Sequence, residues 1–89
     1  MNILEKANEI VNIRSEEKER MYGPFEEGME RAAKILSEMT GVELDASFMY
    51  KAMIALKLTR ESYNHKEDNL LDAVAYIGAL NNYLINKNK

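Results

Sequence analysis

The chain has 89 residues and a formal net charge of -3; 46% of its residues are hydrophobic and 30% charged, with one histidine and no cysteine. This composition predicts one ordered, mostly helical domain over residues 1–89. A chain of this length buries only about 60% of the surface of its unfolded state, so we expect it to be a homo-oligomer. The same composition excludes disulfides, thiolate nucleophiles and zinc sites built from cysteine or several histidines, and the acidic charge argues against DNA or RNA as a partner, since such proteins carry a basic face.

The first segment predicts an amphipathic helix from residue 2 to about 13. Its apolar residues recur at helical spacing and are Ile3, Leu4, Ala7, Ile10 and Val11. Glutamate and lysine interrupt this segment, and nowhere do about 18 apolar residues follow one another, as a membrane span requires. We therefore expect no signal peptide, no membrane partner and a cytoplasmic protein.

Gly23 and Pro24 separate this segment from a second expected helix, which runs from Pro24 to about Met39 and stops at Gly41. The polar run before the break, residues 14–21, either continues the first helix or forms a short turn capped by Ser15. The second helix is expected to bury Phe25, Met29, Ala32, Ala33 and Leu36.

Two longer helices follow. The third has Asp45 as its N-cap and ends near Tyr63, and its expected apolar face consists of Phe48, Met49, Ala52, Met53 and Leu56. The fourth has Asn64 as its N-cap with Glu67 three residues later, the spacing of a capping box. Its expected apolar face consists of Leu71, Val74, Ala75, Gly78 and Leu80, and because a mid-helix glycine has no turn to make, we expect another helix to approach Gly78 closely.

These segments predict an all-α fold: an antiparallel helical bundle of three to four helices, or two packed hairpins, completed by oligomerisation. The six methionines are expected in the core or in the oligomer interface.

Charged residues recur on both sides of the last predicted turn. Lys57 and Arg60 stand three apart on the third helix. Asp68, Asp72 and Tyr76 follow on the fourth at spacings of four, so each set shares one helix edge. In one interpretation the cations and acids pair across the hairpin as a partly buried clasp that fixes its register. In the other, the cations hold a phosphate while the acids orient them, bind ribose hydroxyls or hold Mg²⁺.

A second acidic cluster lies at the start of the second helix. Glu26 and Glu27 each share a helix face with Glu30. In one interpretation these carboxylates point toward the fourth helix. In the other they are solvated residues, which are favoured at a helix N-terminus. Tyr22 either covers a pocket and stacks on a base or packs as a hydrophobic staple. His65 has no nucleophile arranged around it and is expected to be an exposed loop residue.

Residues 20–33 and 53–76 together resemble an uncharacterised family of small, all-helical phage proteins. The resemblance covers about residues 1 to 84 and depends on an ordered set: Tyr22-Gly23, Lys57, Arg60, Asp68, Asp72 and Tyr76. That family is similar to the MazG-type all-α nucleoside triphosphate pyrophosphohydrolases, oligomeric proteins that hold Mg²⁺ with Glu-x-x-Glu on one helix and Glu-x-x-Asp on another. Glu27 and Glu30 fit the first pair, whereas Asp68 and Asp72 are four apart and depart from the second.

The resemblance implies a nucleotide-binding protein in which Lys57 and Arg60 contact phosphate. Asp68 and Asp72 would position these cations or bind sugar hydroxyls, and Tyr22 or Tyr76 would stack on a base. Such binding requires no cofactor. In a phage protein it would sequester a nucleotide-derived host defence signal in the host cytoplasm, without turnover.

Two alternatives stay open. The first is a Mg²⁺-dependent pyrophosphohydrolase, with metal ligands taken from Glu27, Glu30, Asp68 and Asp72. The second is a structural helical interaction module, in which the charged stripes are clasps between subunits.

Overall fold

The computed structural model describes residues 1–13 and 24–87. Its elements are α1 (Ile3–Asn8), which continues as the π-helical turn η1 (Glu9–Ile13), then α3 (Phe25–Thr40), α4 (Ala46–Tyr63) and α5 (Glu67–Lys87). These two ranges contain no strand, so the all-α prediction is confirmed. None of the helices described is both long and apolar enough to cross a membrane. The predictions for residues 14–21, Tyr22 and Gly23 lie outside the described residues.

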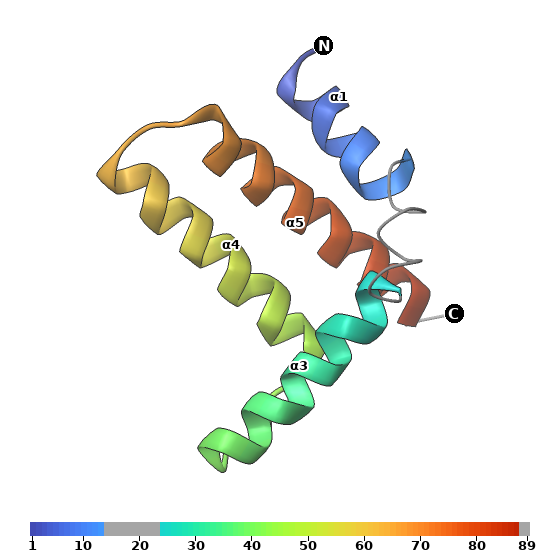
Figure 1. The fold of residues 1–89 in the computed structure, drawn as a ribbon. Helices are drawn as coiled ribbons and strands as arrows, with labels where there is room; N and C mark the ends of the chain where they lie inside the picture. Colours follow the sequence, from blue (N-terminus) through green and yellow to red (C-terminus); the bar gives the residue numbers. More distant parts are fainter. Residues whose placement is uncertain (14–23, 88–89) are drawn as a thin grey trace.

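The helices α4 and α5 form an antiparallel hairpin (Figure 1). Helix α1 lies along α5, and α3 crosses the hairpin near the beginning of α4 (Figure 1). Within the hairpin, Lys57 lies opposite Asp72 and the ring of Tyr50 lies beside that of Tyr83. These two contacts define the register of α4 against α5.

The core lies where α3 meets the open end of the hairpin. Its buried side chains come from three helices and are Met29, Ala46, Tyr50 and Tyr83. The ring centroid of Tyr50 lies 5.5 Å from that of Tyr83 and 5.8 Å from that of Phe25, in an edge-to-face arrangement in the second case. Phe25, which we expected to be buried, remains partly exposed because it is the first residue of α3 and lies at the edge of this cluster.

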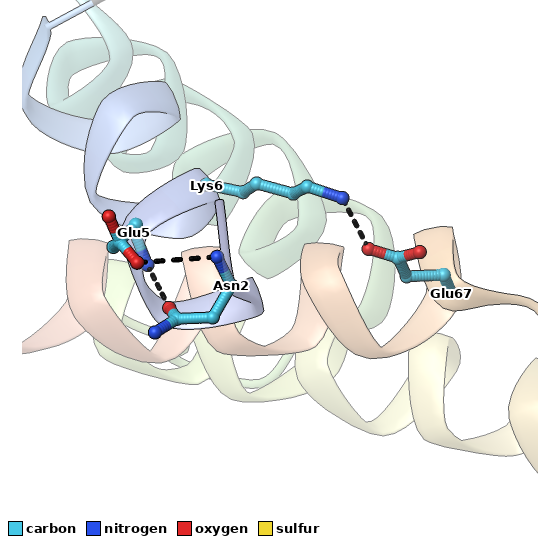
Figure 2. A network of polar contacts seen from close by, with 4 residues as sticks. All are labelled: Asn2, Glu5, Lys6 and Glu67. Atoms are coloured by element: carbon cyan, nitrogen blue, oxygen red, sulfur yellow. Dashed lines mark hydrogen bonds and ion pairs between the residues drawn. The ribbon is translucent and has the colours of Figure 1, made fainter.

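Helix α1 begins with a capping box (Figure 2). Asn2 Oδ1 accepts a hydrogen bond from the Glu5 N–H at 2.9 Å, and Glu5 Oε1 accepts one from the Asn2 N–H at 3.3 Å. Ala7 is buried as predicted, but Leu4 is exposed. The contacting stripe of α1 follows Ile3 and Ala7, and Leu4 is rotated from the middle of this stripe by about 80°.

The connection between α3 and α4 has the predicted stop and start signals. Gly41 ends α3 in the left-handed conformation, with φ of 74°, and its N–H donates to the Ser37 carbonyl at 2.9 Å. Asp45 caps α4, because its Oδ1 accepts a hydrogen bond from the Phe48 N–H at 2.9 Å. Ser37 Oγ also accepts a hydrogen bond from the Leu44 N–H at 2.9 Å, which ties the loop to the last turn of α3.

The start of the last helix differs from the prediction. Asn64 does not cap α5; it ends α4, where its N–H donates to the Arg60 carbonyl at 3.1 Å. Helix α5 begins at Glu67, whose side chain contacts Lys6 instead of completing a capping box. Residues 64–66 form the connection in which the chain reverses between the two antiparallel helices, so α5 begins three residues after Asn64.

The expectation for Gly78 is wrong within a single chain. A Cβ atom added at this position would meet no atom of the described structure within 4 Å. The neighbouring helices therefore leave open space above this glycine.

Candidate ligand-binding site

The cation and the acid that the structure brings together are Lys57 and Asp72. Lys57 Nζ lies 3.2 Å from Asp72 Oδ2, and the two side chains are 16% and 41% exposed. One turn nearer the core, Met53 and Tyr76 pack against buried residues, so the ion pair lies where the apolar contact between α4 and α5 gives way to polar residues. A partly buried pair of this kind defines helix register, while desolvation offsets much of its attraction.

Arg60 and Asp68 lie apart from this pair. Arg60, one turn beyond Lys57, is exposed and makes no ion pair with the residues described. Asp68 is also exposed, and its charge acts on Lys6 of α1: the Glu67 carboxylate raises the pKa of Lys6, and Asp68 adds a smaller effect. Of the two predicted acids, Asp72 therefore pairs with a predicted cation, whereas Asp68 lies near α1.

Glu61 organises the turn next to this site. Its carboxylate contacts His65 Nδ1 and accepts a hydrogen bond from the Lys66 N–H at 3.0 Å. The hydrogen bond with His65 is the main cause that lowers the pKa of Glu61. His65 itself is exposed, as predicted.

Of the two tyrosines predicted to stack on a base, one belongs to the described structure. Tyr76 is half-buried against the core, and its ring centroid lies 6.0 Å from that of Phe25. Tyr76 follows Asp72 by one turn of α5, and its side chain is partly exposed. Tyr22 lies outside the described residues.

A separate groove of about 500 Å³ lies between α3, the start of α4 and the end of α5. It is lined by Glu26, Glu30, Ala33, Lys34, Leu44, Asp45, Ala46, Tyr83, Asn86 and Lys87. Glu26 Oε1 accepts a hydrogen bond from Asn86 Nδ2 at 3.4 Å, and Lys87 Nζ lies 5.8 Å from the centroid of the Tyr83 ring. The groove therefore presents both signs of charge beside an aromatic ring, which suits a small polar molecule.

Sequence reasoning found Glu26 and Glu30 but missed the lining residues from α5. Tyr83 follows Tyr76 by seven residues, a spacing that keeps both on the side of α5 that faces α4. This spacing is the sequence pattern that could have predicted Tyr83 beside α4. The contact of Asn86 with Glu26 could not be predicted from local sequence patterns, because the two residues are 60 positions apart along the chain.

The core cluster, which shares Ala46 and Tyr83 with the lining of this groove, contains an unusual polar group. The hydroxyl of Tyr50 is buried and has no hydrogen-bond partner among the described residues. Burial raises the pKa of Tyr50, and the nearby charges of Glu26, Tyr83 and Glu30 raise it further. The group is therefore a neutral hydroxyl at neutral pH.

The predicted Mg²⁺ ligands do not form a metal site within one chain. Across residues 1–13 and 24–87, no group of three or more His, Cys, Asp or Glu side chains lies close enough to hold an ion. Glu27 lies 4.0 Å from Arg31, Glu30 lines the groove, and Asp72 pairs with Lys57. These carboxylates thus have separate partners or environments, and they do not fit the convergent set that metal-assisted hydrolysis requires.

The fold and this site define a small all-α protein with a half-buried ion pair between two antiparallel helices. The chain belongs to a family described as a domain of unknown function, DUF6378, whose match covers residues 2–84. Neither the curated proteins nor the solved structures gave a match to the chain.

Proposed function

We propose that this chain binds a small phosphate-bearing nucleotide at the turn end of the hairpin between α4 and α5. The observation that carries the proposal is that Asp72 holds Lys57 in place at 3.2 Å while Arg60, one turn further, stays exposed. A guanidinium group offers two parallel N–H donors to a phosphate, and Lys57 adds a second, oriented positive charge. Asp68 is exposed at the same end of α5 and can accept hydrogen bonds from a ribose. Tyr76, which is partly exposed about two turns further along α5, is the proposed surface for a base.

The proposed binding proceeds without turnover. In-line attack on a phosphate chain by metal-activated water needs several carboxylates around the ion. Glu27, Glu30 and Asp72 do not form such a group within the described part of one chain. A site with phosphate-binding cations and without this carboxylate set holds its ligand intact.

The proposed ligand class follows from the resemblance to small phage proteins. We propose a nucleotide-derived signal of host defence, which the protein sequesters by stoichiometric binding in the host cytoplasm. The chemistry common to these signals is one or more phosphates joined to a nucleoside.

Calorimetric titration with nucleoside triphosphates, cyclic dinucleotides and ADP-ribose derivatives tests this proposal. Arg60→Ala should weaken the binding of the preferred nucleotide at least about tenfold, because it removes a charge-assisted phosphate contact. Lys51→Ala is the matched control, since Lys51 is an exposed cation of the same helix but lies on another side of it, and its affinity should equal that of the wild type.

Chromatography of the same mixtures separates the alternatives. A nucleotide recovered intact from the heated protein supports binding without turnover. A Mg²⁺-dependent release of monophosphate would replace the proposal by pyrophosphohydrolase activity. Absence of binding across the panel, or equal affinities for the Arg60→Ala and wild-type proteins, would refute the proposed site.

Self-association is a second proposed property, favoured by a different observation. Large apolar side chains of the described helices, including Ile35, Met39, Phe48, Leu56 and Tyr63, stay exposed. Exposed apolar surface of this kind favours association. We propose that the partner is another copy of this chain.

A further inference from the structure

The side of α4 that points away from its buried residues carries an uncharged stripe. We call it the α4 stripe, and it consists of Phe48, Ala52, Ala55, Leu56, Thr59 and Tyr63. Ala55 and Leu56 are neighbours, and the other successive members are three or four positions apart, which keeps the set on one helix face. Phe48 is 44%, Leu56 42% and Tyr63 94% exposed, so large apolar surface lies open along the whole helix.

No described helix covers this stripe. Helix α4 contacts α5 along its length and α3 near its beginning, and Figure 1 shows α5 along one side of α4 and no helix along the opposite side. The buried residues of α4, Ala46 and Tyr50, occupy the other face. Helix α4 therefore has two apolar faces, of which the chain's own core uses one.

The α4 stripe is symmetric about its midpoint. Counting outward from the bond between Ala55 and Leu56, Ala52 and Thr59 are equally distant, and so are Phe48 and Tyr63. The two ends carry aromatic rings, and every position between them except Leu56 carries a small side chain. Because a two-fold interface brings one surface against itself, a stripe with this symmetry fits its own copy in the antiparallel direction.

From this pattern we infer that the α4 stripe is a homodimer interface, in which two copies of α4 pack antiparallel about a two-fold axis near Ala55 and Leu56. Phe48 of each copy then meets Tyr63 of the other, and Ala52 meets Thr59. The small side chains let the helix axes approach, while the rings close the two ends. The inference rests on the proposed self-association and is independent of nucleotide binding.

The dimensions of the stripe are consistent with this partner. A stable interface buries about 800 Å² on each side. The stripe extends over about 22 Å of helix. No charged residue within it would be desolvated by pairing.

Sedimentation equilibrium of Ala55→Glu tests the interface. This exposed central position tolerates glutamate in a folded monomer, but the dimer would bring two carboxylates together at its axis. We expect the dissociation constant of the dimer to rise at least about tenfold, with an unchanged circular dichroism spectrum. Asn81→Glu, which places a glutamate at an exposed position of α5 outside the stripe, is the control and should leave the dimer intact.

Cysteine cross-linking tests the direction of the helices, and the absence of natural cysteines makes it clean. A mixture of Ala52→Cys and Thr59→Cys chains should give the mixed disulfide dimer on oxidation, whereas neither variant alone should cross-link efficiently. Efficient cross-linking of each variant with itself would instead indicate parallel helices and overturn the antiparallel arrangement.

The outcomes of these experiments distinguish the proposed α4 interface from self-association in general, on which it rests. A monomeric wild-type protein would overturn both. An oligomeric wild type whose association is equally strong in Ala55→Glu and Asn81→Glu would overturn the α4 stripe and leave self-association standing. Loss of association in Ala55→Glu alone, together with the mixed disulfide, supports the interface.

Discussion

The hydroxyl of Tyr50 is the residue-scale feature with the clearest energetic consequence. It is fully buried without a hydrogen-bond partner in the described structure, a condition that costs about 1 to 3 kcal/mol. Tyr50→Phe removes the hydroxyl and keeps the ring contacts with Phe25 and Tyr83. We expect the free energy of unfolding, measured in urea, to rise by about 1 kcal/mol.

The control for this experiment is Tyr63→Phe, because the Tyr63 side chain is almost fully exposed. It should change the free energy of unfolding by less than about 0.5 kcal/mol. A clear loss of stability in Tyr50→Phe would mean that the hydroxyl has a partner in solution, such as a water molecule or a ligand in the adjoining groove.

At the scale of elements, the contact between α1 and α5 includes an ion pair that has a defined pH window. Lys6 Nζ lies 2.7 Å from Glu67 Oε1 (Figure 2). The hydrogen bond with Lys6 lowers the pKa of Glu67 below its ordinary value of 4.5. The ion pair therefore stabilises the folded state fully above pH 4.5, and this contribution is lost as the pH falls through the lowered pKa of Glu67. The same hydrogen bond raises the pKa of Lys6 above its ordinary value of 10.5. The contribution of the ion pair to folding stability is therefore full below pH 10.5 and is lost as the pH rises through the raised pKa of Lys6.

We therefore expect Glu67→Gln to be less stable than the wild type near neutral pH and equally stable in acid, well below pH 4.5. The measurement is the free energy of unfolding in urea at a series of pH values. Lys6→Gln should show the same window, and the double variant should lose no more than either single one. A difference that persists in strong acid would mean that Glu67 acts through another contact.

At the scale of the whole molecule, the small core and the large exposed surface predict a stability that depends on protein concentration. Three helices contribute the buried cluster around Tyr50, and α4 keeps a second apolar face open. If copies associate in the folded state, the thermal midpoint should rise with protein concentration by mass action. Scanning calorimetry at several concentrations measures this, and Ala55→Glu should remove the dependence while retaining the folded baseline.

Local signals in the sequence predicted much of the fold. Asp45 and Gly41 bound their helices as expected, because a cap is made by hydrogen bonds to residues three or four positions away. The contact between Lys57 and Asp72 was one of two open interpretations of the charge pattern, and the hairpin geometry brings these residues together. The nucleotide site built around them stays a prediction.

The sequence by itself thus determined the all-α class and most helix bounds, since each depends on short spacings along the chain. Only the tertiary structure decided the remainder. It assigned Asn64 to the end of α4, directed Glu67 toward Lys6, and assembled the groove from Glu26 and Asn86. It also kept the carboxylates apart and left the α4 stripe uncovered. The physical reason is that these features depend on how helices far apart in sequence pack together, and local periodicity carries no information about which neighbour a helix face will meet.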